Sequence, residues 1–175
     1  MSSVSIIAYS NEWPVCFSRT REELISVFAN ASVQVEHIGS TAVPGLAAKP
    51  VIDVLLGADT LGAIESRIKD LERLGYRYIP KYEQALPTRR YFTKAAGPDS
   101  LRVHLHAVVR GSRIWREQIA FRDALRSDAS LRAEYQSLKQ ALAETFAQDK
   151  ASYTAAKEPF VRSVLSSLQP ALGAD

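Results

Sequence analysis

The sequence predicts a mixed α/β domain in which a small β-sheet is flanked by helices and closed by a C-terminal helical bundle. Two observations support this prediction. Strand-like apolar runs alternate with segments of helical periodicity up to residue 111, whereas the residues from 112 onward show helical periodicity alone. We therefore expect an α/β core over residues 1–111 and a helical cap over residues 112–175 that packs on the same domain.

The core elements follow from the spacing of apolar residues. A first helix is expected after residue 11, with a buried stripe formed by Val15, Phe17, Leu24, Ile25, Val27 and Phe28. Alternating or uninterrupted apolar runs predict strands at residues 32–38, 51–56, 76–79, 90–94 and 101–109. One helix is expected between the second and third strands, from residue 59 or 60 to about 74, and Gly75 ends it.

The C-terminal part is predicted to be helical throughout. Apolar positions at helical spacing indicate helices at about 113–126, 130–147 and 150–168. Pro159 is expected to kink or break the last of them, because proline cannot donate to the helical hydrogen-bond ladder.

Composition is typical of a globular protein. Of the 175 residues, 46% are hydrophobic and 23% are charged, and the net charge of +3 favours anionic partners only mildly. The single cysteine, Cys16, excludes an internal disulfide and suits a reducing compartment. Because no run approaches the length of a membrane span and no secretory signal is recognisable, we expect a cytoplasmic protein with no membrane partner.

Residues 36–57, EHIGSTAVPGLAAKPVIDVLLG, form the most unusual stretch of the chain. Five of the six residues from Val51 to Leu56 are branched aliphatics, as in a strand buried on both faces, and the sixth is Asp53. A carboxylate in such a strand is costly to bury unless a cation or hydrogen bonds compensate its charge. Asp53 is therefore either a metal ligand or a structural acid that accepts internal hydrogen bonds.

A Gly-Ser-Thr turn precedes this strand. Gly39 lets backbone N–H groups approach an anion, and Ser40 and Thr41 add hydroxyl donors. We expect these three residues to bind phosphate, while Asp53 binds the Mg²⁺ that accompanies a triphosphate. The alternative is that the glycines and prolines of this stretch only shape a tight loop.

The stretch resembles the GrpB family, whose signature is close to HIGSTxVPGLxxKPxID and is matched from His37 to Asp53 without a gap. The resemblance implies a fold of the nucleotidyltransferase superfamily, in which a Gly-Ser turn is followed by an acid–hydrophobic–acid strand. The turn and Asp53 fit that pattern. The second acid is missing, because its position is taken by Leu55, which cannot bind a metal.

The strand expected at residues 101–109 alternates, so that His104 and His106 share one face. In the superfamily implied by the resemblance, this strand carries the third acid of the metal site, and the GrpB pattern has His-x-His there. Both histidines are therefore candidate catalytic residues. His106 would act as a metal ligand, a general base or a donor to phosphate. The alternative is that the pair lines a polar sheet face and hydrogen-bonds neighbouring strands.

Basic side chains complete the expected site. Arg90 and Lys94 share a strand face and would neutralise triphosphate charge, unless they form a solvated sheet edge. Tyr153 and Lys157 lie on one helix face, where the family keeps Tyr-x-x-x-Lys and superfamily members commonly offer a lysine to the triphosphate. Lys49 adds a further charge in the central stretch.

These features predict transfer of a nucleoside monophosphate from an NTP to a small-molecule or macromolecular acceptor; the sequence does not exclude a nucleic acid as that acceptor, but no aromatic and basic surface pattern supports one. Mg²⁺ or Mn²⁺ would be the cofactor, held by Asp53 and His106; imidazole also suits Zn²⁺. A second hypothesis, favoured by Leu55, is a nucleotide-binding module without turnover. A third is a transition-metal phosphohydrolase whose ligands would be Glu36, His37, Asp53, His104 and His106. Strand alternation weighs against the third, because it separates Glu36 from His37.

Overall fold

The computed structural model describes residues 5–28 and 32–172. Residues 1–4 and 173–175, at the ends of the two expected parts, lie outside the described residues. The elements are α1 (Glu12–Val27), β1 (Val33–Ile38), the 3-10 turn η1 (Ser40–Ala42), β2 (Val51–Ala58), α2 (Leu61–Glu65), α3 (Ile68–Arg73), β3 (Tyr76–Tyr78), the 3-10 turn η2 (Pro80–Tyr82), β4 (Arg89–Lys94), β5 (Arg102–Val109), α4 (Arg113–Ser127), α5 (Ala129–Thr145), α6 (Lys150–Ala156) and α7 (Glu158–Leu172).

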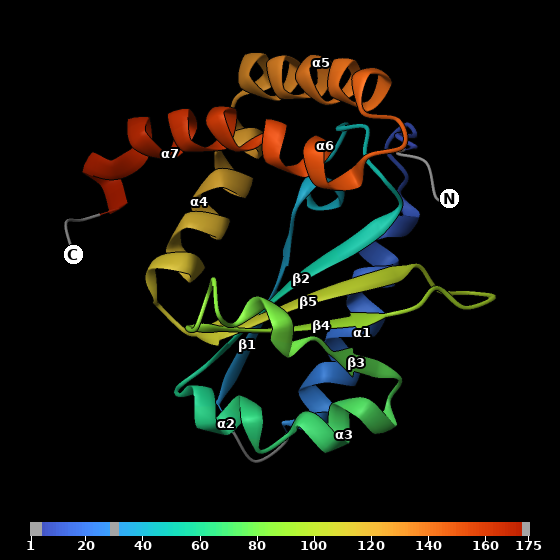
Figure 1. The fold of residues 1–175 in the computed structure, drawn as a ribbon, viewed down its shortest axis with the longest axis vertical. Coiled ribbons are helices and arrows are strands. Elements are labelled where there is room, and N and C mark those ends of the chain that lie inside the picture. The colour runs from blue at the N-terminus through green and yellow to red at the C-terminus, as the bar shows by residue number, and fades with distance from the viewer. Residues whose placement is uncertain (1–4, 29–31, 173–175) are drawn as a thin grey trace.

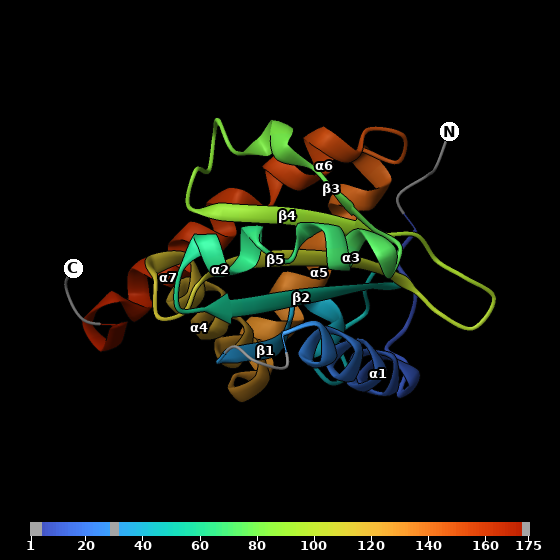
Figure 2. The ribbon, with the colours of Figure 1, turned by 90° about the horizontal axis from the view of Figure 1, so that it is seen from below.

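The strands form one mixed sheet in the order β1-β2-β5-β4-β3 (Figure 2). β2 and β5 are parallel, whereas the other neighbouring pairs are antiparallel. The register of the parallel pair places Asp53 beside His104 and Leu55 beside His106. On β4, Tyr91 pairs with His106 and extends this row. The predicted catalytic side chains therefore lie in adjacent rows at the middle of the sheet.

Helices cover both faces of the sheet (Figure 1). α1, α2 and α3 pack on one face through the main apolar cluster, which includes Trp13, Leu24, Phe28, Ile52, Val54, Leu56, Ile64, Leu71, Phe92 and Leu105. On the other face, Trp115 of α4 packs against the sheet. Helices α4–α7 lie together on this second side, as Figure 1 shows. In the described part of the chain, no helix is both long and apolar enough to cross a bilayer.

The five expected strands form within one or two residues of their predicted bounds, but two helices differ from the prediction. The helix expected up to residue 74 is divided into α2 and α3. At the break, the Ser66 hydroxyl donates to the carbonyl of Ala63, which competes with helix continuation. The last predicted helix is divided at Lys157 into α6 and α7, with Pro159 in the first turn of α7, as the proline indicated.

The buried stripe of α1 was predicted only in part. Leu24 and Phe28 are buried, but Val15 and Ile25 are 43% and 36% exposed. Trp13 is 2% exposed and makes an edge contact with Tyr9, their ring centroids 5.2 Å apart. Burial of Trp13 fixes the rotation of the helix, and a residue two positions further along then points away from the sheet.

Candidate functional site

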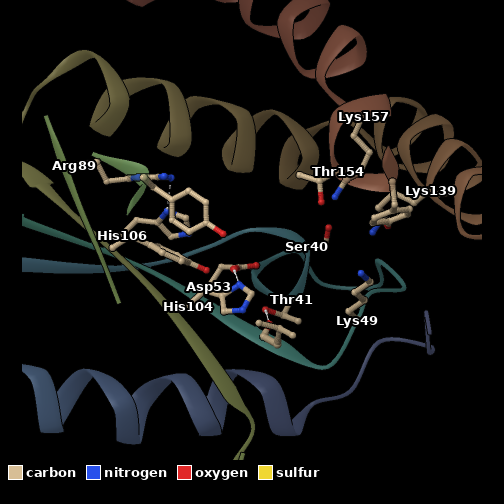
Figure 3. A pocket seen from close by; sticks show the side chains of 14 residues that line it. Ser40, Thr41, Lys49, Asp53, Arg89, His104, His106, Lys139, Thr154 and Lys157 are labelled. Atoms are coloured by element: carbon tan, nitrogen blue, oxygen red, sulfur yellow. Dashed lines mark hydrogen bonds and ion pairs between the residues drawn. The ribbon is translucent and has the colours of Figure 1, made fainter. Parts of the chain in front are cut away.

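A cavity of about 480 Å³ lies between the sheet and the C-terminal helices (Figure 3). Strands β2, β4 and β5 contribute one side, the segment between β1 and β2 contributes a second, and α5 and α6 contribute a third. This volume is in the range of small-molecule sites. The lining residues, which include most of those predicted from the sequence, are Ser40, Thr41, Lys49, Val51, Asp53, Tyr82, Arg89, Tyr91, His104, His106, Lys139, Tyr153, Thr154 and Lys157.

Asp53 lies in the middle of the cavity, and Gly39 makes its position possible. Gly39 follows β1 with a φ of 71°, a left-handed conformation that glycine adopts without a Cβ penalty. A Cβ at this position would collide with the Asp53 carboxylate. The Asp53 side chain is 29% exposed, and its Oδ1 lies 3.3 Å from Nδ1 of His104. Asp53 is thus open to a ligand while His104 contacts it from β5.

Ser40 and Thr41 both line the cavity, but their hydroxyls differ in availability. Thr41 is 1% exposed, and its hydroxyl donates to the carbonyl of Val51 at 2.9 Å. Because a hydroxyl has one hydrogen, the 3.0 Å contact between Thr41 and His37 is a bond donated by Nε2 of His37. Thr41 therefore ties the turn to both strands. Ser40 lies in hydrogen-bonding contact with Tyr135, and when the Tyr135 O–H donates to Ser40, the single hydrogen of Ser40 can go to a ligand.

Lys49 and Lys157 both contact the ring of Tyr153. Their Nζ atoms lie 4.5 Å and 4.4 Å from its centroid, and Tyr153 is 3% exposed. Burial lowers the pKa of Lys157 to about 8; the Lys49 ammonium acts in the same direction and the Asp53 carboxylate opposes it. Burial also lowers the pKa of Lys49. Both ammonium groups have lost hydration, so an anion that enters the cavity would stabilise their charged forms.

Lys139 of α5 is a third lysine of the cavity, and the sequence reasoning missed it. It is 2% exposed, and its Nζ donates to the carbonyl of Ala47 at 2.5 Å. Burial lowers the pKa of Lys139 to about 7, with the Lys157 charge acting in the same direction. A repeated spacing could have revealed this residue, because Tyr135 precedes Lys139 by four positions as Tyr153 precedes Lys157. Each tyrosine ring lies within 5.1 Å of the ammonium one turn later.

The cavity has two ends on either side of Asp53, as Figure 3 shows. We name them the lysine end, formed by Lys49, Lys139 and Lys157, and the arginine end, formed by Arg89 and His106. Four basic side chains therefore line a cavity that contains one carboxylate. Such a balance favours anionic ligands, and partial burial strengthens the attraction because solvent screening is reduced.

At the arginine end, Nη1 of Arg89 lies 3.2 Å from Nδ1 of His106. Because a guanidinium can only donate, Nδ1 accepts and the neutral ring carries its hydrogen on Nε2. Burial lowers the pKa of His106 to about 4, so that the ring is neutral near pH 7. It then offers a donor at Nε2 rather than a lone pair. This placement supports the predicted role of His106 as a donor to phosphate more than the roles of metal ligand or base.

Arg90 and Lys94 do not line the cavity. They point to the sheet face that α1–α3 cover, where Arg90 pairs with Glu65 of α2 at 2.7 Å and Lys94 pairs with Glu23 of α1 at 2.8 Å. They do share one face, as the alternation predicts, but it is the face opposite Asp53, and Arg89 faces the cavity instead. The phosphate-binding role expected for Arg90 and Lys94 therefore has no support in their placement.

Comparison with known proteins identifies the family. The profile of the family described as GrpB protein matches residues 3–167. The chain belongs to the GrpB family. Glutamate-rich protein GrpB of Alkalihalophilus pseudofirmus is 31% identical over 168 residues, which cover 94% of this chain and 95% of that protein. UPF0157 protein YqkA of Bacillus subtilis is 33% identical over 159 residues, which cover 91% of this chain and 45% of YqkA; this chain thus spans less than half of that relative.

Solved structures place this GrpB chain among nucleotidyltransferase-like folds. The crystal structure of GrpB from Enterococcus faecalis matches with a TM-score of 0.82 and 30% identity, covering 93% of this chain and 96% of that one. The poly(A) polymerase complex GLD-2–GLD-3 matches with a TM-score of 0.60 and 16% identity, covering 93% of this chain and 55% of that one. At that identity the likeness shows the fold alone.

Leu55 shows where this GrpB chain departs from an acid–hydrophobic–acid strand. It is completely buried and packs with Ile38, Val108 and Trp115, outside the cavity. Because Trp115 belongs to α4, the position of the missing second acid is part of the apolar contact between the sheet and the C-terminal helices. A carboxylate there would be buried against a tryptophan ring instead of reaching a ligand.

The donor set limits which metal this GrpB chain could hold. Among residues 5–28 and 32–172, no group of three or more His, Cys, Asp or Glu side chains is arranged to hold a metal ion. The transition-metal site of the third hypothesis is not assembled, because His37 stacks on Phe17 of α1 while Glu36 pairs with Arg122 of α4. Asp53 alone fits Mg²⁺ or Mn²⁺ if nucleotide phosphates and water complete the coordination.

Proposed function

We propose that this protein is a metal-dependent nucleotidyltransferase that transfers a nucleoside monophosphate from an NTP to an acceptor. The observation that carries the proposal is the convergence of three lysines from separate segments on one end of a cavity that has Asp53 at its middle. Lysines there complement phosphate charge, and a lone carboxylate complements a divalent cation. The nucleotidyltransferase-like fold supports the same reaction class.

The triphosphate would occupy the lysine end. The β- and γ-phosphates would accept hydrogen bonds from Ser40 and from the ammonium groups of Lys49, Lys139 and Lys157, which already lie within the cavity lining. Tyr153 would position Lys49 and Lys157 through its ring instead of contacting phosphate through its hydroxyl. Phosphate binding would raise the pKa of Lys139 and Lys157 towards the ordinary lysine value, because it replaces the hydration lost on burial.

In the transfer, an acceptor oxygen forms a bond to the α-phosphorus, and the bond from that phosphorus to the bridging oxygen breaks. Pyrophosphate leaves with the electron pair. His104 would take the acceptor proton at Nε2, since its Nδ1 faces Asp53 at 3.3 Å. His106 would donate from Nε2 to a phosphate oxygen. A divalent cation held by Asp53 would neutralise charge on the phosphates.

The test is calorimetric titration of the four NTPs with Mg²⁺ and then with Mn²⁺, followed by an assay for released pyrophosphate. We expect metal-dependent binding by the wild type, with losses of about tenfold or more in Asp53→Asn and Lys157→Met. The matched controls are Asp99→Asn, in the exposed β4–β5 hairpin, and Lys69→Met, exposed on α3. If no NTP binds with either metal, or if the controls lose as much affinity as the site variants, the proposal is wrong.

A nucleotide-binding module without turnover is the second candidate, and the burial of Leu55 is the observation that favours it. The same titration separates the two candidates when candidate acceptors are added. NTP binding lost in Asp53→Asn, without pyrophosphate release across a panel of hydroxyl and amine acceptors, would favour the binding module. Release of pyrophosphate with any acceptor would favour the transferase.

A further inference from the structure

Arg89 lines the cavity, but it has no role in the triphosphate binding proposed above. Its guanidinium donates to His106 through Nη1 and lies 5.3 Å from the ring centroid of Tyr91. Its Nε is buried and has no hydrogen-bond partner among the described residues. Burial lowers the pKa of Arg89, and the neighbouring Tyr91 and Tyr82 act in the opposite direction. Arg89 nevertheless lines the cavity, so its guanidinium is the cation that an anion entering this end would meet.

The neighbouring arginine shows what a satisfied guanidinium looks like in this fold. On the opposite face of the same strand, Arg90 pairs with Glu65 at 2.7 Å and lies 3.5 Å from Glu83. Arg89 has no ion pair with a carboxylate in the described part of the chain, although it is half-buried. Because carboxylates and phosphates match the planar fork of a guanidinium, the missing partner of Arg89 is most simply an oxyanion.

The order of groups along the cavity indicates which substrate would bring that oxyanion. Figure 3 shows the lysine end and Arg89 on opposite sides of Asp53. In phosphoryl-type displacement, the attacking and leaving oxygens are roughly in line. If pyrophosphate leaves towards the lysine end, the acceptor must approach from the arginine end. Arg89 would then face the acceptor instead of the leaving group.

We propose that Arg89 binds an anionic group, a carboxylate or a phosphate, of a small acceptor molecule, and so selects acceptors that carry this group near the attacking oxygen. This inference rests on the proposed nucleotidyl transfer. A small molecule fits better than a nucleic acid, because nucleic acids are bound along tracks of several basic side chains. At this end of the cavity Arg89 is a single cation, accompanied by His106 and two tyrosine rings, Tyr82 and Tyr91.

The test follows the Nε–H resonance of Arg89 by ¹⁵N–¹H NMR. Inorganic phosphate and acetate, and a short RNA as a competing ligand, are titrated separately, first into the free protein and then into protein loaded with Mg²⁺ and a non-hydrolysable NTP. We expect a saturable shift of the Arg89 resonance with at least one anion, and the anion that acts identifies phosphate or carboxylate. Because variants at Arg89 lack this resonance, their anion binding is measured by calorimetric titration of the same two anions: Arg89→Gln should weaken it about tenfold or more, and Arg89→Lys should retain part of it. Arg102→Gln, which removes an exposed arginine outside the cavity lining, should leave it unchanged.

Three results would overturn the inference. A response to the NTP alone would assign Arg89 to the nucleotide, a response only to a short RNA would assign it to a nucleic-acid end, and no response to any of these would make it structural. Failure of the proposed function gives a different pattern. If phosphate or acetate shifts the Arg89 resonance while no NTP binds, the anion-binding role of Arg89 is supported and nucleotidyl transfer is refuted. If the NTP binds and the Arg89 resonance responds to neither anion, only this inference is refuted.

Discussion

The Asp53 carboxylate lies against the Cα of Gly39, in the space where any other residue would place its Cβ. The two residues belong to successive elements, because Gly39 follows β1 and Asp53 lies in β2, the strand that pairs with β1. Glycine thus serves twice at this position: it adopts a positive φ of 71°, and it leaves room for the central acid. The Gly-Ser turn and the acid form one unit in space.

Replacement of Gly39 by alanine should therefore destabilise the protein more than strain alone explains. Gly45 provides the matched control, since its φ is 79° and a Cβ there would meet no atom within 4 Å. We expect Gly45→Ala to lower the free energy of unfolding by about 1–2 kcal/mol, the cost of a left-handed alanine. Gly39→Ala should lose about 1–3 kcal/mol more, because the Asp53 side chain must move and because the ψ of −173° at Gly39, together with its positive φ, is essentially restricted to glycine. Urea denaturation measures both; equal losses would contradict the close contact.

The buried lysines predict proton uptake when a triphosphate binds. With a pKa of about 8 for Lys157 and about 7 for Lys139, both lysines are substantially neutral at pH 8. A bound phosphate raises each pKa, so up to about 1.4 protons should be taken from solution for each triphosphate bound, about 0.5 by Lys157 and about 0.9 by Lys139. Calorimetry of ATP binding in buffers of different ionisation enthalpy measures this number. We expect uptake at pH 8, little at pH 6, and its loss in Lys139→Met combined with Lys157→Met. An enthalpy independent of the buffer at pH 8 would contradict the shifted pKa values.

Leu55→Asp should not restore a two-carboxylate metal site. Leu55 is completely buried against Trp115, so truncation to alanine should cost about 2–5 kcal/mol, and aspartate should cost more because its charge is buried. The control is Leu86→Asp, at a leucine that is 38% exposed, where the change should stay within about 1 kcal/mol. Urea denaturation with and without Mn²⁺ is the measurement. Wild-type stability together with new Mn²⁺ binding in Leu55→Asp would refute the packing argument.

Local sequence patterns were sufficient to predict the strands, the turn at Gly39 and the exceptional acid at Asp53. A carboxylate inside an apolar run and a glycine between a strand and hydroxyl residues are anomalies that neighbouring residues make visible. The positions of His104 and His106 on one face also followed from alternation, and the structure places both in the cavity lining. These features depend on backbone periodicity, which can be recognised from the spacing of residues in the sequence.

The roles of Arg89 and Lys139 could not be predicted in the same way. Alternation separates Arg89 from Arg90 but does not say which of them faces the site; Glu65 on α2, far away in sequence, holds Arg90 on the other face. The sequence around Lys139 is that of an ordinary exposed helix lysine. Its burial becomes evident only in the structure, where its ammonium donates to the carbonyl of Ala47, 92 positions earlier. Both assignments depend on tertiary contacts between distant segments.

His106 should stay neutral, with its hydrogen on Nε2, throughout the physiological pH range. Its pKa of about 4 in the folded protein lies below the 6.5 of an unfolded histidine, so between these values the unfolded state binds more protons. The contribution of His106 to stability is therefore fully present above about pH 6.5 and is lost as the pH falls towards 4. His37 behaves alike, since burial lowers its pKa to about 4 as well.

¹⁵N NMR of the imidazoles reports tautomer and titration together, and His106→Gln should flatten part of the stability loss below pH 6.5. A hydrogen on Nδ1, or titration of His106 near pH 6.5, would show that Arg89 does not donate to the ring and would return His106 to the role of base or metal ligand.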